Sequence, residues 1–167
     1  MLAVNGAIEQ VRGFARLLAP VELSGDDLQS ALARLSAEVE KVFGIQCCVN
    51  TVPIPSLTNE QTQHLCRIAQ EAVRNAAQHA KATRIDISIG VGQKQLTLAV
   101  RNNGSAWNLP EEPSQGLGFR IMRHRTAVLE GVLSIEPNES GGTLLTCRVP
   151  IGPDRGRAGS LDPALNI

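Results

Sequence analysis

Apolar residues recur every three or four positions in the first part of the chain, which is the spacing of one face of a helix. The first such run lies at residues 4–18 and ends before Pro20. A second run covers residues 28–42, with Ser24 as a suitable N-cap and Gly44 as a suitable end. Both runs predict amphipathic helices. The first helix is equally compatible with packing on its own domain and with forming half of a coiled-coil or four-helix dimer interface.

The rest of the chain alternates between strand and helix patterns. In order, we expect a strand at 45–52, a helix at 58–80, a hairpin of strands at 84–91 and 95–101, a helix at 119–130, and strands at 132–136 and 143–149. The buried face of the long helix should consist of Leu65, Ile68, Ala69, Ala72, Val73 and Ala76. This order predicts an α+β fold, built as a two-layer α/β sandwich. Residues 102–118 lack periodicity and should form a loop, and loops of this length in a domain are usually functional or mobile.

Composition and charge narrow the classes of function. Hydrophobic residues make up 43% of the chain and charged residues 19%, which is typical of a globular domain. Sixteen basic and sixteen acidic residues give no net charge, so we expect no nucleic-acid partner. The four cysteines form no metal-binding spacing, and no apolar run approaches the ~20 residues that span a bilayer. We therefore expect a cytoplasmic chain with reduced thiols, any membrane anchor of a parent protein lying upstream.

Three polar residues follow one edge of the long helix at four-residue steps. Glu71, Asn75 and His79 share this edge, at the border of the apolar face. Carboxylate and carboxamide oxygens are hard ligands that suit Mg²⁺, which binds few protein oxygens and completes its shell with phosphate and water. On spacing alone, a polar helix edge without a ligand is the commoner explanation.

Two glycine clusters shift the balance toward a ligand site, and a third is weaker evidence that a hairpin turn alone would explain. Asn102-Asn103-Gly104 ends a strand, Gly116-Leu117-Gly118 opens a helix, and Gly141-Gly142-Thr143 joins the last two strands. Glycines at the start of a helix let backbone N–H groups approach a phosphate closely. Each cluster alone is also an ordinary turn signal.

Taken in order and spacing, these segments resemble bacterial sensor histidine kinases of the nitrate-sensor type. RIAQEAVRNAAQHAKA (67–82) is similar to their N-box, and NNG, GLG and GGT fall at their two glycine boxes and closing Gly-Gly-Thr. The resemblance implies a GHKL (Bergerat-type) ATP-binding domain at residues 21–151. Residues 1–20 would be a remnant of the second dimerisation helix, and residues 152–167 a flexible tail.

The resemblance also implies a role for each matching residue. Asn75 would coordinate Mg²⁺ bridging the phosphates of ATP, with Glu71 contacting the metal's water shell or orienting Asn75. His79 and Lys81 would lie near the phosphates. Asn102 and Gly104 would hold the adenine, residues 105–117 would form a lid, Gly116 and Gly118 would line the phosphate path, and Thr143 would fix water beneath the adenine.

The chain departs from the family pattern at two positions of the first glycine box. Asn102 stands where the family has an aspartate, and Ala106 where it has a glycine. Loss of the aspartate charge should weaken the adenine contact by about 1–2 kcal/mol, or roughly tenfold in affinity. Ala106 would add about another kcal/mol if its backbone needs a positive φ. We therefore expect weak ATP binding.

Functions of different classes stay open at this point. The leading hypothesis is a histidine kinase catalytic domain that transfers the γ-phosphoryl group of ATP to a histidine on an upstream helix absent from this chain. Its partners would be its own dimerisation and phosphoacceptor helices, a response regulator and, as one alternative, a second copy. The runner-up is a degenerate kinase-like domain that serves as a dimerisation or signalling module. A stand-alone serine kinase resembling anti-sigma factors is the third.

Overall fold

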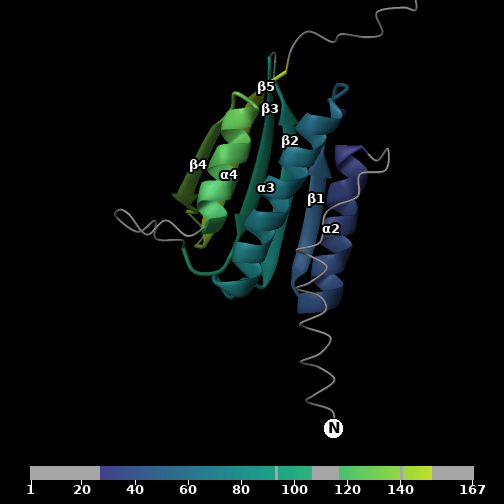
Figure 1. The fold of residues 1–167 in the computed structure, drawn as a ribbon. Helices are drawn as coiled ribbons and strands as arrows, with labels where there is room; N and C mark the ends of the chain where they lie inside the picture. The colour runs from purple at the N-terminus through teal and green to yellow at the C-terminus, as the bar shows by residue number, and fades with distance from the viewer. Residues whose placement is uncertain (1–26, 93, 107–116, 140, 152–167) are drawn as a thin grey trace, which may run out of the picture.

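A computed structural model describes residues 27–92, 94–106, 117–139 and 141–151. The described elements, in chain order, are α2 (Leu28–Phe43), β1 (Gln46–Thr51), α3 (Asn59–Gln78), β2 (Arg84–Val91), β3 (Gln95–Asn102), α4 (Leu117–Val128), β4 (Val132–Pro137) and β5 (Thr143–Pro150). The helices form one layer on a single sheet (Figure 1). This confirms the predicted α+β sandwich, while the predicted helix at 4–18 and the tail at 152–167 lie outside the described residues.

The sheet has five strands in the order β1-β2-β3-β5-β4. Strands β1 and β2 run parallel and are joined by α3, because a parallel pair needs a crossover connection. The other neighbours are antiparallel, with β2 and β3 forming the predicted hairpin. Strand β3 lies at the centre of the sheet and pairs antiparallel with β5, so the end of β3 lies beside the turn before β5.

The predicted pattern of burial in α3 is confirmed. All six residues expected on the buried face of α3 are buried, and Leu65, Ile68 and Val73 are fully enclosed. A capping box between Thr58 and Gln61 fixes the start of this helix. The helix ends at Gln78, two residues before the predicted boundary.

The ends of α2 were predicted with one error. Gly44 ends the helix with a φ of 64°, as expected for a left-handed C-cap. Ser24 as the N-cap is wrong, because the Asp27 carboxylate accepts the hydrogen bond from the Ser30 N–H at 2.7 Å. This hydrogen bond lowers the pKa of Asp27.

Helix α4 begins and ends two residues earlier than predicted. Glu130 has a φ of 53°, and the Gly131 N–H donates to the Thr126 carbonyl at 2.9 Å, so the chain leaves the helix at this turn. A β-carbon on Gly131 would overlap the carbonyl oxygen of Arg148 in β5. The contact with β5 therefore sets the end of the helix, which the sequence pattern did not reveal.

The burial of Cys47 and Cys48 follows the alternation of a strand, and Cys66 lies in α3. Adjacent Cys47 and Cys48 point to opposite faces of β1, so the first is buried and the second is partly exposed. Burial raises the pKa of the Cys47 thiol to about 11 and that of Cys66 to about 12. All four thiols are free, as predicted.

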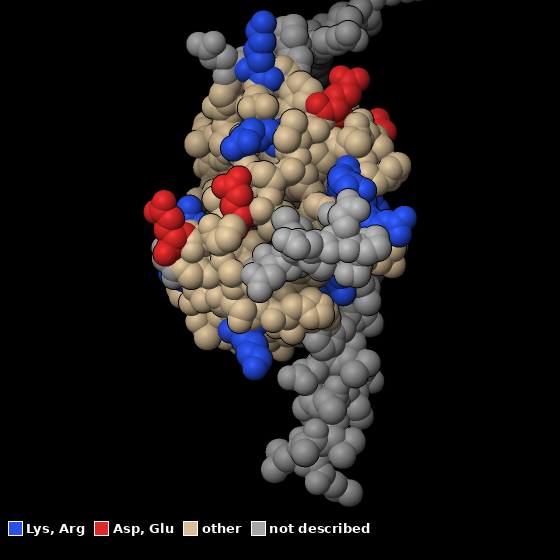
Figure 2. Space-filling view, turned by 90° about the vertical axis from the view of Figure 1, so that its left-hand side faces the viewer, with Lys and Arg blue, Asp and Glu red and all other residues tan. Residues whose placement is uncertain are grey.

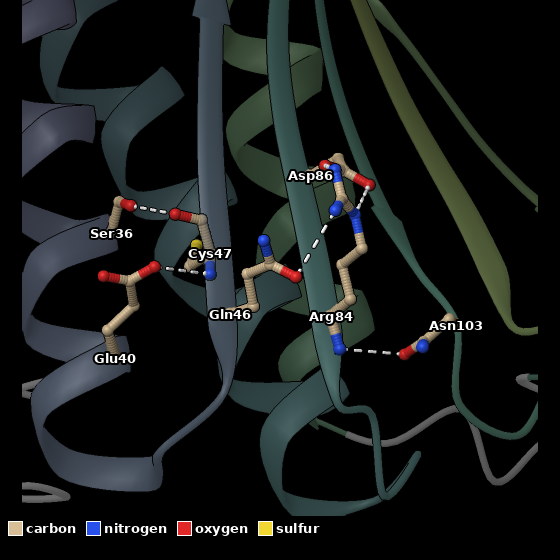
Figure 3. A network of polar contacts seen from close by, with 7 residues as sticks. All are labelled: Ser36, Glu40, Gln46, Cys47, Arg84, Asp86 and Asn103. Carbon is tan, nitrogen blue, oxygen red and sulfur yellow. Dashed lines mark hydrogen bonds and ion pairs between the residues drawn. The ribbon is translucent and has the colours of Figure 1, made fainter.

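Side chains from α2 cover the free edge of β1 (Figure 3). The Ser36 hydroxyl donates to the Cys47 carbonyl at 2.5 Å, and Glu40 accepts the Cys47 N–H at 3.0 Å. Farther along the sheet, the Arg84 guanidinium pairs with Asp86, and the Arg84 N–H donates to the Asn103 side chain at 2.9 Å. These contacts protect an edge strand and tie the segment after β3 to the start of β2.

The surface is mixed in charge. On the α4 and β4 side of the molecule, basic and acidic side chains are interspersed among uncharged ones (Figure 2). This distribution agrees with the balanced composition. None of the described helices combines the length and the hydropathy needed to cross a membrane.

The packing of α3 generates a stability prediction. Leu65→Ala should lower the free energy of unfolding by about 2–5 kcal/mol, because the side chain is fully buried and its removal leaves a cavity. Urea denaturation measures the change. Val128→Ala is the control, since this side chain is 42% exposed and should change stability by under about 1 kcal/mol. Equal effects of both variants would contradict the placement of α3 in the core.

Candidate functional site

The polar edge of α3 forms a connected group of side chains rather than separate residues. Arg74 pairs with Glu71: its Nε lies 3.0 Å from Oε2, and one terminal nitrogen contacts Oε1. The same terminal nitrogen lies 3.4 Å from Oδ1 of Asn75. The Glu71 and Arg74 side chains are only 16% and 25% exposed. Carboxylate, guanidinium and carboxamide thus form one half-buried unit, and Arg74 is a member that the motif alone did not indicate.

Gly118, in the first turn of α4, packs directly on this unit. A β-carbon on Gly118 would overlap Oε1 of Glu71 and would lie 3.2 Å from a terminal nitrogen of Arg74. The glycine therefore lets the backbone of α4 approach the ion pair. The Glu71 carboxylate also lies at the N-terminal turn of α4, where unpaired backbone N–H groups favour a negative charge. Predicted residues Glu71, Asn75 and Gly118 are brought together.

The segment after β3 lies against the C-terminal end of α3. The Ser105 N–H donates to the Ala80 carbonyl at 2.7 Å, and a β-carbon on Gly104 would overlap that carbonyl oxygen. His79, the C-cap of α3, and Lys81 flank Ala80 in the chain, and both are exposed. Lys81 has a φ of 51°, a strained conformation for a residue with a side chain. The predicted positions 79, 81 and 104 are thus neighbours.

Asn102 joins the first and third glycine clusters. It is 8% exposed, and its Oδ1 accepts a hydrogen bond from the Gly104 N–H at 3.0 Å. Gly142 has a φ of 86°, and a β-carbon there would overlap the Asn102 carbonyl oxygen. Thr143 follows at once and is 5% exposed. Asn102, Gly104 and Thr143 therefore lie at one end of the sheet.

Asn103 holds this junction in place. Its Oδ1 accepts hydrogen bonds from the N–H groups of Thr83 and Arg84 at 3.0 and 2.9 Å, and its Nδ2 donates to the Thr83 hydroxyl. Figure 3 shows the contact with Arg84. The second asparagine of the NNG motif is thus explained by the fold alone.

Two predictions concern the loop after Gly104. Gly116 and most of the predicted lid lie within residues 107–116, outside the described part of the chain. The strain expected at Ala106 is wrong: among the described non-glycine residues, positive φ values occur at Lys81 and Glu130. Replacement of a glycine at position 106 therefore carries no conformational cost here.

The side chains at the polar edge of α3 suit a metal ion with few protein ligands better than one held entirely by protein side chains. Among the described residues, no three His, Cys, Asp or Glu side chains come together as ligands. The donor that remains is the half-buried Asn75 carboxamide oxygen, with both Glu71 oxygens engaged by Arg74. A single protein oxygen suits Mg²⁺, which keeps several water ligands.

Comparison with known proteins decides the family. Residues 60–153 match the family of histidine kinase-, DNA gyrase B-, and HSP90-like ATPases, which is more than half of the chain. The chain belongs to this family. The resemblance to sensor histidine kinases of the nitrate-sensor type is thereby confirmed, and so is the GHKL character of the domain.

Curated relatives of the family are longer sensor proteins. The sensor histidine kinase LiaS of Bacillus subtilis is 29% identical over 148 residues, which are 89% of this chain and 41% of LiaS. The nitrate/nitrite sensor protein NarQ of Escherichia coli is 31% identical over 146 residues, 86% of this chain and 26% of NarQ. The chain thus spans less than half the length of these relatives.

Solved structures confirm the fold. The histidine kinase domain of the Erythrobacter litoralis EL346 blue-light activated histidine kinase aligns with a TM-score of 0.66 at 20% identity. The alignment covers 87% of this chain and 75% of that domain. The mixed sheet with helices on one face is therefore the fold of a known histidine kinase domain.

The glycine contacts generate a second prediction. Gly104→Ala should lower the free energy of unfolding by about 1–3 kcal/mol, because its β-carbon would meet backbone atoms of Ala80 that cannot rotate away. Gly90→Ala is the matched control, since no atom lies within 4 Å of its β-carbon, and it should change stability by under about 0.5 kcal/mol. Chemical denaturation measures both. A neutral Gly104→Ala would contradict the close approach to α3.

Proposed function

We propose that this chain is the ATP-binding catalytic domain of a two-component sensor histidine kinase. In this proposal it binds Mg-ATP and transfers the γ-phosphoryl group to a histidine on an upstream helix. The observation that carries the proposal is the Glu71–Arg74–Asn75 unit on α3, packed against Gly118 at the start of α4 and close in sequence to the Ala80–Gly104 contact. Membership of the ATPase family supports a nucleotide as the ligand.

The adenine would bind at the junction of β3 and the turn before β5. The Asn102 carboxamide would accept a hydrogen bond from the exocyclic amine through the second lone pair of Oδ1, since the first takes the Gly104 N–H. The buried Thr143 hydroxyl would hold water beneath the base. Gly104 would let the segment after β3 pack closely on the end of α3, so that this segment does not obstruct the adenine.

The phosphates would extend from this junction toward α4. Backbone N–H groups at Gly116 and Gly118 would meet the phosphate oxygens at the positive end of the helix dipole. The exposed side chains of His79 and Lys81 would add donors from the end of α3. Residues 105–117 would cover the nucleotide as a lid.

Asn75 would hold Mg²⁺ through its carboxamide oxygen, and Glu71 would act by orientation rather than by direct ligation. When bound, the ion would neutralise negative charge on the transferring phosphoryl group. The contribution of this chain is positioning: it aligns the γ-phosphate with a nucleophile that comes from another helix. The acceptor histidine and its base belong to that helix.

The remaining parts of the proposal concern the parent protein. Residues 1–20 would continue a dimerisation helix, residues 21–151 would form the ATPase domain, and the partner downstream would be a response regulator. We propose a cytoplasmic location, with a homodimer formed through the dimerisation helices. A degenerate signalling module is the second candidate, because Asn102 lacks the family's carboxylate and Arg74 engages Glu71.

Nucleotide titration tests the proposal. Isothermal titration with a non-hydrolysable ATP analogue and Mg²⁺ should detect binding to the wild type, and Asn75→Ala should remove the gain in affinity that Mg²⁺ gives. Gln63→Ala, an exposed position on the same helix, should bind as the wild type does. No binding to the wild type at millimolar nucleotide would refute the kinase function and leave the signalling module.

The adenine contact has its own test. Asn102→Asp should tighten ATP binding on the order of tenfold, because a carboxylate accepts a stronger hydrogen bond from the adenine amine and still accepts the Gly104 N–H. Asn103→Asp is the matched control and should leave the affinity unchanged, because the Asn103 side chain bonds to Thr83 and Arg84 of the protein itself. An unchanged or weaker affinity of Asn102→Asp would place the adenine elsewhere.

A further inference from the structure

Arg74 is a charged residue at the proposed nucleotide site to which the motif assigns no role. We infer that Arg74 substitutes in part for a metal ion at this site. Paired with Glu71, it cancels the charge of the carboxylate and supplies positive charge beside the Asn75 carboxamide. The chain should therefore bind a nucleoside triphosphate with a weaker dependence on Mg²⁺ than a free carboxylate would allow. This inference rests on the proposed function.

The guanidinium is held in place by α3 itself. It contacts Glu71 three residues before it, Asn75 directly after it and Gln78 four residues after it, the last at 3.3 Å. Glu71 and Gln78 lie on the same side of the helix as Arg74 because they are three and four residues away, and Asn75 is its neighbour in the chain, so all three contacts form within α3. The planar guanidinium is pre-organised by them, which reduces the entropy lost when it binds an anion.

The guanidinium also faces the element that should receive the phosphates. A β-carbon on Gly118 would lie 3.2 Å from its terminal nitrogen, so Arg74 reaches the first turn of α4. Its side chain is 25% exposed and thus accessible from solvent. Its contacts with Glu71, Asn75 and Gln78 engage four of its five N–H groups. The fifth is on the terminal nitrogen that contacts Gln78, and it can donate to a phosphate oxygen.

The charges explain the expected dependence on metal. An unpaired Glu71 would repel the triphosphate unless a cation lay between them, and binding would then require Mg²⁺. The ion pair removes this repulsion. A cation on Oδ1 of Asn75 would in turn be repelled by the guanidinium at 3.4 Å, which reduces the gain from Mg²⁺.

Nucleotide affinity measured with and without metal tests the inference. The dissociation constant of ATP is determined in Mg²⁺ and in EDTA for the wild type, Arg74→Gln and Glu71→Gln. Arg74→Gln should weaken binding in EDTA on the order of tenfold and change it less in Mg²⁺, because it restores the uncompensated carboxylate. Glu71→Gln should tighten binding in EDTA, because it leaves the guanidinium charge unpaired. Arg74→Lys should bind in EDTA more tightly than Arg74→Gln.

The controls separate charge at the site from charge in general and from folding. Arg148→Gln removes the same charge from an exposed position in β5 on the sheet face away from the helices, and it should leave both constants unchanged. Circular dichroism during heating shows whether each variant folds. An equal loss of affinity in Mg²⁺ and EDTA for Arg74→Gln, or no tightening for Glu71→Gln, would overturn the inference alone. No nucleotide binding by the wild type in either buffer would overturn the proposed function and the inference with it.

Discussion

Close backbone contacts at three glycines organise this molecule. Gly104 lies on the Ala80 carbonyl at the end of α3, Gly142 on the Asn102 carbonyl, and Gly118 on the Glu71–Arg74 ion pair. A β-carbon at any of these positions would overlap its neighbour, so each contact sets how near two elements can come. Together they draw the ends of α3, β3 and the turn before β5 into one region and seat the start of α4 on the polar edge of α3. The candidate site is a consequence of this packing.

The contacts give the glycine motifs a structural meaning beside the ligand role that the family implies. Gly118 leaves room for a side-chain pair of the protein itself, and Gly104 leaves room for a helix end. Nucleotide binding in the proposed function therefore uses a framework whose geometry is already fixed by protein contacts. The same framework places an arginine beside the expected phosphate path, which joins the fold to the electrostatics of the site.

Much of the fold followed from periodicity. The apolar spacing of α3 correctly predicted six of its buried residues, and the alternation of apolar and polar residues in β2 and β3 predicted their hairpin. Burial of one face imposes a period of about 3.6 residues on a helix and of two residues on a strand. One error is local: Asp27 rather than Ser24 caps α2, through its hydrogen bond with Ser30. The other arose from a distant contact, because β5 sets the end of α4. The site residues followed from a motif, but Arg74 did not, since only the side-chain geometry shows that it joins Glu71 to Asn75.

Backbone and side-chain amide chemical shifts during titration with a nucleotide test the central claim most directly. We expect ATP to shift the amide signals of Gly104, Gly118 and Gly142 and the side-chain amide signal of Asn75. Signals of Thr97 and Arg148, on the sheet face away from the helices, should stay in place. Shifts confined to that opposite face, or no shifts at saturating nucleotide, would contradict the account.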